Sequence, residues 1–205
     1  MTTTTNYPNG QSLVSTALSP SQISLFIQSI TYAAIGLPVP PPSSFQPVQV
    51  DWQTSGQPAS TLPSQDVCYI SCVPYDDEYS KIRNQTFSGA GPVLETWVYS
   101  KGWRIAWVAY GPNSEDRLRA VKSAMFLDYF NDQFNLQNLF PIPDYQEVQR
   151  VPELIQAQWW ERADFSINVL EQITETISDS QATSVEVKVY EGTGSTPVAD
   201  FTIDA

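Results

Sequence analysis

Residues 158–171 of this 205-residue chain, QWWERADFSINVLE, combine two adjacent tryptophans, a charge cluster and a long extended run. Apolar and polar side chains alternate through the stretch, which is the period of two expected of a strand with one buried face. None of its side chains looks like a catalytic nucleophile or a metal ligand. We therefore expect a role in a protein assembly rather than in catalysis. The sequence therefore predicts a central sheet strand with one set of positions in the core, Trp159, Ala163, Phe165, Ile167 and Val169, and the other set facing away, Trp160, Arg162, Asp164, Ser166, Asn168 and Leu170.

The composition limits the possible functions. With 41% hydrophobic and 12% aromatic residues the chain can bury a core, and its length fits one domain with appendages. The net charge of -12 argues against a nucleic-acid-binding surface, which needs Lys and Arg to neutralise phosphates. No segment approaches the roughly 18 consecutive apolar residues that span a bilayer. The N-terminus lacks the basic and apolar regions of a secretory signal, so we expect a soluble intracellular product.

Histidine is absent from the sequence, and the cysteines are Cys68 and Cys72. The absence of histidine removes the commonest general base and transition-metal ligand. In an extended segment the two thiols would lie about 13 Å apart, at a rise near 3.3 Å per residue. That distance excludes a mutual disulfide or a shared metal, so we expect inert thiols, no metal and no cofactor.

Two main helices are predicted. Ser19 and Pro20 are a suitable cap and first turn for the first helix, which Gly36 ends. Gly111 and Pro112 break a strand before the second helix, which Asn113 or Ser114 caps. The apolar face of the second helix is formed by Leu118, Val121, Met125 and Tyr129.

The remaining signals indicate strands. We expect them at residues 48–52, 66–75, 94–99 and 103–110, with residues 100–102 as a hairpin turn, and a terminal hairpin at 185–190 and 198–203. Residues 1–18 read as a flexible arm. The expected fold is α+β: a mainly antiparallel sheet with two main helices packed on one face. Its expected divisions are an N-terminal arm (1–18), a main domain (19–178) and a C-terminal β-hairpin extension (179–205).

Carboxylates offer few catalytic possibilities. Asp164 and Glu161 could act as a glycosidase pair only within a cleft, and the clustered acids at 76–78 lack the ligand spacing of a calcium loop. Arg162, between those two acids, forms either a salt bridge on the exposed strand face or a bidentate pair with a neighbouring subunit. We therefore predict no catalytic and no metal-binding residues.

Two runs of sequence resemble a known family. AYGPNSEDRLRAVKSAMF, residues 109–126, and VPELIQAQWWERADFSINV, residues 151–169, are similar to the phage neck terminator proteins, the tail-terminator or head-to-tail completion proteins of tailed bacteriophages. The similarity extends less strictly over residues 18–175. The positions that match are Tyr110, Gly111, Pro112, Asn113, Leu118, Arg119, Pro152, Glu153, Leu154, Trp159, Arg162, Ala163 and Asp164.

The resemblance implies a structural virion protein rather than an enzyme. Such a protein forms a ring, expected to be hexameric, in the phage neck at the head–tail junction and is assembled in the host cytoplasm. Its partners would be copies of itself, head connector or adaptor proteins, and tail tube or sheath proteins, with no membrane contact. DNA would pass through without specific binding, and acidic residues lining the channel would keep it from sticking. The residues expected at the subunit interface are Trp160, Arg162, Asp164, Arg119 and Asn113.

Two other classes remain open. A monomeric carbohydrate- or protein-binding module could use Trp97, Trp103 and Trp107 as an exposed row, although large aromatic side chains are more often buried. A hydrolase would need two carboxylates of perturbed acidity in a concave pocket. Exposure of the tryptophans and the surroundings of the carboxylates distinguish these classes.

Overall fold

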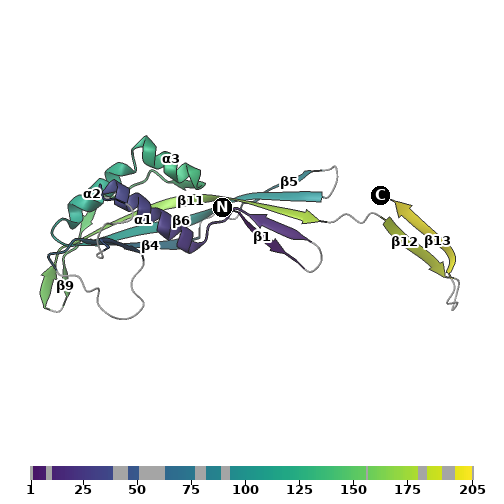
Figure 1. Ribbon diagram of the computed structural model, residues 1–205, viewed down its shortest axis with the longest axis horizontal. Coiled ribbons are helices and arrows are strands. Elements are labelled where there is room, and N and C mark those ends of the chain that lie inside the picture. Colours follow the sequence, from purple (N-terminus) through teal and green to yellow (C-terminus); the bar gives the residue numbers. More distant parts are fainter. Residues whose placement is uncertain are drawn as a thin grey trace.

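Two strands of 18 residues, β6 (Val93–Tyr110) and β11 (Arg162–Asp179), form the axis of the molecule. They pair antiparallel from Arg162 opposite Tyr110 to Asp179 opposite Val93. At about 3.3 Å per residue each strand spans roughly 60 Å, and both run through the body in Figure 1. The computed structural model describes residues 2–7, 11–38, 46–50, 63–76, 82–88, 93–155, 157–179, 184–190 and 197–204.

Shorter strands complete the main sheet on both sides of this pair. The sheet has the order β1-β2-β11-β6-β4-β3; β5 also pairs with β6, and β7 and β8 pair with β11. All these pairs are antiparallel except β3 with β4. The bounds are β1 (Thr3–Asn6), β2 (Ser12–Ser15), β3 (Val48–Val50), β4 (Val67–Tyr75), β5 (Asn84–Ser88), β7 (Leu139–Pro141) and β8 (Gln149–Arg150).

Two hairpins form separate two-stranded sheets. β9 (Glu153–Ile155) pairs with β10 (Gln158–Trp160), with Trp159 opposite Leu154. β12 (Ser184–Tyr190) pairs with β13 (Pro197–Asp204), which confirms the terminal hairpin read from the sequence.

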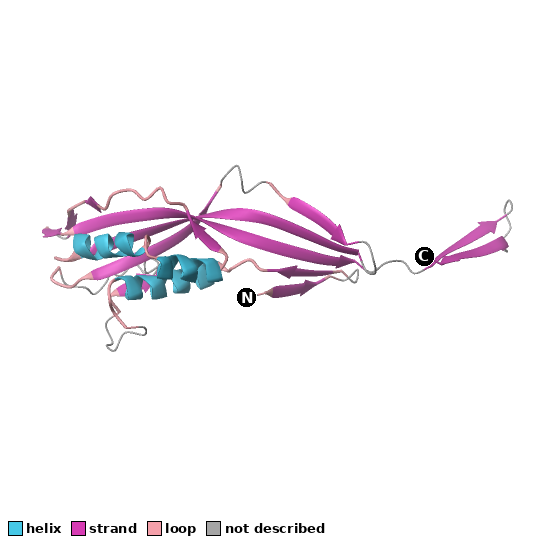
Figure 2. Cartoon of the chain, turned by 90° about the horizontal axis from the view of Figure 1, so that it is seen from above, coloured by secondary structure: helices cyan, strands magenta, loops and turns pink. Residues whose placement is uncertain are grey.

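Three helices cover one face of half of the main sheet (Figures 1 and 2). They are α1 (Pro20–Ala34), α2 (Ser114–Ala124) and α3 (Asp128–Leu136). Ser19 caps α1 as predicted: its hydroxyl accepts from the Gln22 amide at 3.2 Å, and the Gln22 side chain accepts from the Ser19 amide at 2.7 Å. This reciprocal pair satisfies two backbone donors that the helix start would otherwise leave free.

The core lies between the helices and alternate positions of β6 and β11. Trp107 stacks on Phe165 with ring centroids 5.5 Å apart, and its indole N–H donates to the Thr31 hydroxyl at 2.8 Å. The predicted inward set of β11 is confirmed at Ala163, Phe165, Ile167 and Val169, and the helix face is confirmed at Leu118, Val121 and Met125, all buried.

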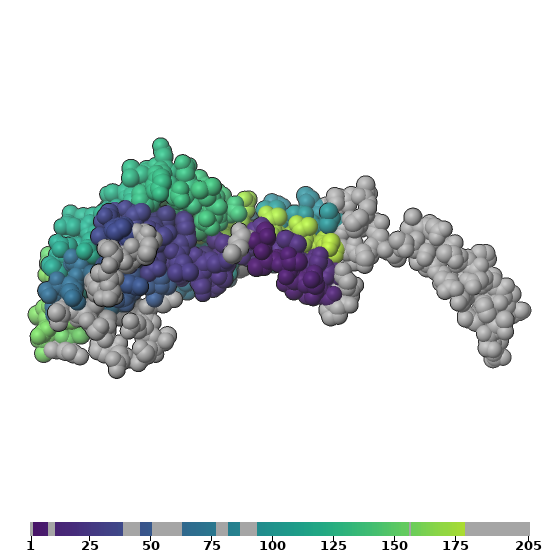
Figure 3. All heavy atoms as spheres, in the orientation of Figure 1, coloured from purple at the N-terminus to yellow at the C-terminus, as the bar shows by residue number. Residues whose placement is uncertain are grey.

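Beyond the helices the same two strands continue as an uncovered sheet. We call this part the β-arm: residues 93–101 of β6 and 172–179 of β11, with β1, β2 and β5. Figure 3 shows it as a narrower extension of the helix-covered body. Between residues 94 and 101 each side chain of β6 is partly or fully exposed, whereas Trp103, Ile105 and Trp107 are buried.

The expected α+β class is wrong. The protein is mostly β, with three helices and a large curled sheet in its described part. The second predicted helix divides into α2 and α3, which leaves Tyr129 exposed. The predicted turn at residues 100–102 is also wrong, because β6 continues through it. Gly102 keeps extended backbone, and a Cβ there would lie 2.7 Å from the Tyr75 ring on β4, so this glycine permits close approach instead of a turn.

The N-terminal residues contain two ordered strands, although we expected a flexible arm. β1 pairs with β2, and β2 pairs with β11 from Ser15 opposite Glu175 to Ser12 opposite Ser178. The division of the chain at residues 18 and 178 stays a prediction. The acids at 77–78 lie outside the described residues.

Candidate assembly site

Most motif residues of the two sequence runs lie at the end of the sheet opposite the β-arm. Gly111 joins β6 to α2 with a φ of +108°, a conformation that L side chains rarely adopt. A Cβ at this position would lie 2.5 Å from Asp66 Oδ1 and 2.6 Å from the Gln65 carbonyl oxygen. Its amide donates to the Glu161 carbonyl at 3.0 Å. The motif glycine therefore brings the start of α2 against two other segments.

Asp66 fixes the start of α2. Its carboxylate accepts from the Asn113 backbone amide and side-chain amide, both at 2.9 Å. Arg117, one turn into the helix, pairs with the same carboxylate at 3.3 Å. A negative charge here also suits the positive end of the helix dipole. Asn113 caps no amide with its own side chain, so its part in the motif is to hold Asp66.

Arg162 is the centre of a second cluster. Its Nε and Nη2 donate to the two oxygens of Asp164, each at 2.8 Å, and its Nη1 donates to Glu153 at 3.0 Å. The Tyr110 hydroxyl donates to the same Glu153 oxygen at 2.8 Å. This arrangement ties β9 to the last residue of β6 and the first residues of β11. The Arg162 side chain is 25% exposed, so the pairing is partly shielded from solvent.

These contacts shift the pKa values of three groups in the cluster. Hydrogen bonds from Tyr110 and then Arg162 hold the pKa of Glu153 below its ordinary 4.5, because both stabilise the carboxylate. Burial and the bond to Glu153 raise the pKa of Tyr110. The bond to Asp164 raises the pKa of Arg162, which stays a cation at every ordinary pH.

The β9–β10 hairpin packs on the sheet face away from the helices. Trp160 packs edge-on against Tyr110, which packs edge-on against Tyr69, each with ring centroids 6.1 Å apart. Trp159 points away from this small apolar cluster and is 71% exposed. The core position predicted for Trp159 is therefore wrong, because the strand is interrupted at Glu161 and residues 158–160 belong to the hairpin.

These contacts fit the phage family that the two runs suggested. A family model described as phage neck terminator protein matches residues 22–196. The chain belongs to the phage neck terminator protein family. Comparison with curated proteins gives no match. The family is a structural one of the phage neck, so this chain is a structural protein of a phage particle.

Most motif positions have partners within the chain. Tyr110, Gly111, Asn113, Arg162 and Asp164 lie in the two clusters just described, and Ala163 is buried. Arg119 lies elsewhere, on the outer side of α2, where it pairs with Glu115 at 2.7 Å. The expected pairing of Arg162 with a neighbouring subunit stays a prediction, and within one subunit its guanidinium already binds two carboxylates.

One buried acid was missed in the sequence. Glu171 is 1% exposed; it accepts from the Leu18 amide at 2.6 Å and from the Trp103 indole at 2.7 Å. It thereby fastens the segment between β2 and α1 at the point where the body becomes the β-arm. The sequence could have indicated its burial, because residue 171 lies two positions after the buried Val169 and so points to the same face of β11.

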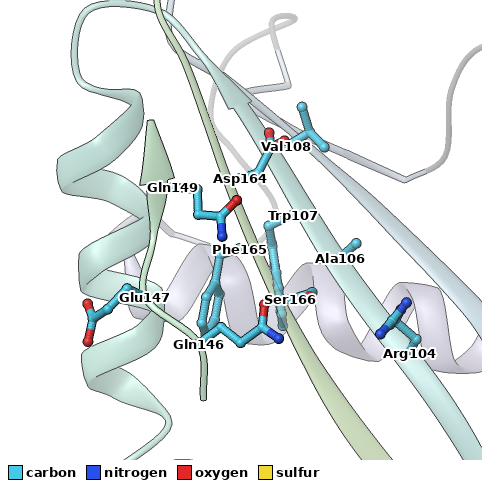
Figure 4. Close-up of a pocket in the computed structure, with 10 residues that line it drawn as sticks. All are labelled: Arg104, Ala106, Trp107, Val108, Gln146, Glu147, Gln149, Asp164, Phe165 and Ser166. Carbon is cyan, nitrogen blue, oxygen red and sulfur yellow. The ribbon is translucent and has the colours of Figure 1, made fainter. Parts of the chain in front are cut away.

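A cleft of about 340 Å³ opens on the face away from the helices, between β6, β11 and residues 146–149 (Figure 4). Its lining acids are engaged: Glu147 with Lys122 at 2.6 Å, and Asp164 with Arg162. Glu161, the other acid of the suggested glycosidase pair, binds Arg150 at 2.6 Å. The cleft therefore does not present a free pair of carboxylates for hydrolysis.

Other candidate sites are limited as well. Trp103 and Trp107 are fully buried, which excludes an exposed row with Trp97. Within the described residues no three Cys, Asp or Glu side chains gather as metal ligands, and Cys68 and Cys72 are not joined by a disulfide. No helix in the described part of the chain is long and apolar enough to cross a bilayer.

Proposed function

We propose that the protein forms a ring of six subunits that terminates the tail and joins it to the head connector. The β-arm carries this proposal. A sheet without a helix layer exposes both faces, and its outer strands leave backbone donors and acceptors free for pairing. Covering such a surface with a neighbouring subunit buries apolar area that one chain alone leaves in water.

The β-arm has side chains suited to a partly buried interface. Arg83 stacks on the rings of Trp97 and Tyr99, with distances of 5.2 and 4.8 Å to the centroids. Tyr99 donates to Glu175 at 3.0 Å, and burial together with this bond raises the pKa of Tyr99 to about 12. Aromatic and Arg side chains of this kind are enriched at protein interfaces.

The ring would leave a channel for DNA. With a net charge of -12 the subunit can line that channel with carboxylates, which repel the phosphate backbone and let the genome slide. The faces of the ring would contact head connector or adaptor proteins on one side and tail tube or sheath proteins on the other. Such a protein assembles in the host cytoplasm and stays in the virion at the head–tail junction.

A charge placed in the β-arm tests the proposal. Val98 is half-buried in β6, opposite Thr174 of β11. We expect Val98→Asp to abolish the ring, because a covered carboxylate without a partner is costly, while the monomer keeps its helix-covered core. Electron microscopy measures whether rings form, and circular dichroism measures whether the variant keeps its fold. Rings of normal size and yield in this variant would contradict the role of the β-arm.

A further inference from the structure

Two clusters of exposed apolar side chains lie on opposite faces of the main sheet. The hairpin patch consists of Leu154 and Trp159, which are cross-strand neighbours in β9 and β10, with Trp159 71% exposed. The α3 patch lies on the helix layer and consists of Phe126, Leu127, Tyr129 and Leu136, of which Leu136 is 72% exposed. Because the sheet separates them, the two patches of one chain cannot cover each other.

Most motif residues have contacts within the chain, whereas Leu154 and Trp159 leave large apolar side chains exposed. The other members of the hairpin hold it in place: Glu153 binds Tyr110 and Arg162, and Trp160 packs on Tyr110. The hairpin is thus a fixed support that presents a tryptophan to the surroundings. Tryptophan is one of the side chains enriched among the few residues that dominate the energy of protein interfaces.

Charge indicates which surface receives the hairpin. Residues 123–149, which contain α3, include four acids and neither Lys nor Arg. Asp132 lies on the same face of α3 as Tyr129 and Leu136, at helical spacings of three and four. Beside the hairpin, Arg150 directs its bonds to one oxygen of Glu161 and keeps a largely exposed side chain. If the hairpin patch meets the α3 patch, apolar side chains face apolar side chains. Arg150 then lies opposite Asp132, so the charges at the rim of the contact are also complementary.

We infer that the hairpin patch of one subunit docks on the α3 patch of the next copy. This inference rests on the ring proposed above and names one of its contacts. Two different patches that meet head to tail form a heterologous interface, which generates a closed ring when the rotation between subunits closes. Trp159 is the anchor of the contact, Leu154 supports it, and Arg150 faces the acidic edge of α3.

Alanine variants measure the contact. We expect Trp159→Ala and Leu136→Ala each to raise the dissociation constant of the oligomer about 30-fold or more. Both side chains are exposed in the single chain, so its thermal unfolding should stay unchanged. The double variant should lose less than the two single effects combined, because the two side chains share one contact. Leu25→Ala, on α1 and 62% exposed, is the matched control and should associate normally.

Crosslinking identifies the partner. Chains carrying Cys72→Ser with either Gln158→Cys, beside Trp159, or Asn135→Cys, beside Leu136, are mixed and treated with a short bismaleimide. Both positions are exposed, and the remaining Cys68 is buried. We expect covalent dimers only when the two kinds of chain are mixed, because each patch faces the other patch.

The outcomes separate this inference from the proposed function. Normal rings in both alanine variants, or rings without the mixed crosslink, would refute the docking and leave the ring intact. Rings that form normally but no longer bind a connector or tail protein would show that Trp159 contacts that protein. This result would also refute the docking of the hairpin patch on the α3 patch. A wild-type chain that never associates would refute both.

Discussion

At the scale of single residues, Gly111 sets the geometry that joins β6 to α2. We expect Gly111→Ala to destabilise the fold by about 1–3 kcal/mol or more, because a left-handed backbone and a Cβ against Asp66 act together. Gly36→Ala is the matched control: its φ is +72°, but no atom lies within 4 Å of the added Cβ. Urea unfolding measures both. Equal losses in the two variants would show that close approach to Asp66 is unimportant.

Glu153 should make stability depend on pH in the acid range. Its folded pKa lies below 4.5, so its contribution is present above that pH and is lost as pH falls through the folded pKa. The difference in free energy of unfolding between wild type and Glu153→Gln should therefore be full at pH 6 and shrink toward pH 3. Urea unfolding across this range checks it. A difference that does not change with pH would contradict the assignment.

At the scale of elements, Arg162 holds the β9–β10 hairpin on the sheet. We expect Arg162→Ala to impair ring assembly more than folding, since the hairpin loses its tie while the core stays packed. The loss in unfolding free energy should be about 1–2 kcal/mol, and the dissociation constant of the oligomer should rise at least about tenfold.

Sedimentation velocity and thermal unfolding separate these two effects. Arg162→Lys keeps the charge but cannot form the two-oxygen pair with Asp164, so it should lie between wild type and the alanine variant. An alanine variant that assembles with the wild-type constant would remove Arg162 from the interface.

The elements differ in how far the sequence predicted them. The buried positions of β11 were predictable because alternation is a local property. The position of Trp159 was not, because the interruption at Glu161 moves the preceding residues into a hairpin on the other face. In the sequence, Gly102 was typical of a hairpin turn. The structure shows instead that glycine is needed there because the Tyr75 ring of a neighbouring strand lies close to it.

The contacts within the candidate site were beyond the sequence too. The two runs stand in the order that the family resemblance requires, but nothing local shows that Asp66 binds Asn113 or that Tyr110 and Arg162 share Glu153. These pairs join residues that are distant in the chain. Glu171 could have been found from its parity in the strand.

At the scale of the whole molecule, the protein divides into a helix-covered body and a bare β-arm along the same two strands (Figure 2). The sequence did not predict this division, because apolar and polar residues alternate along β6 on both sides of Gly102. Where the cover ends depends on how far three helices reach along a strand of roughly 60 Å. In the proposed ring, a neighbouring subunit would cover this bare half of the sheet.

Electron microscopy of the purified protein, alone and with tail and connector proteins, tests whether the ring forms. We expect closed rings of six subunits with a central channel. A persistent monomer in every mixture, or open filaments without closed rings, would contradict it.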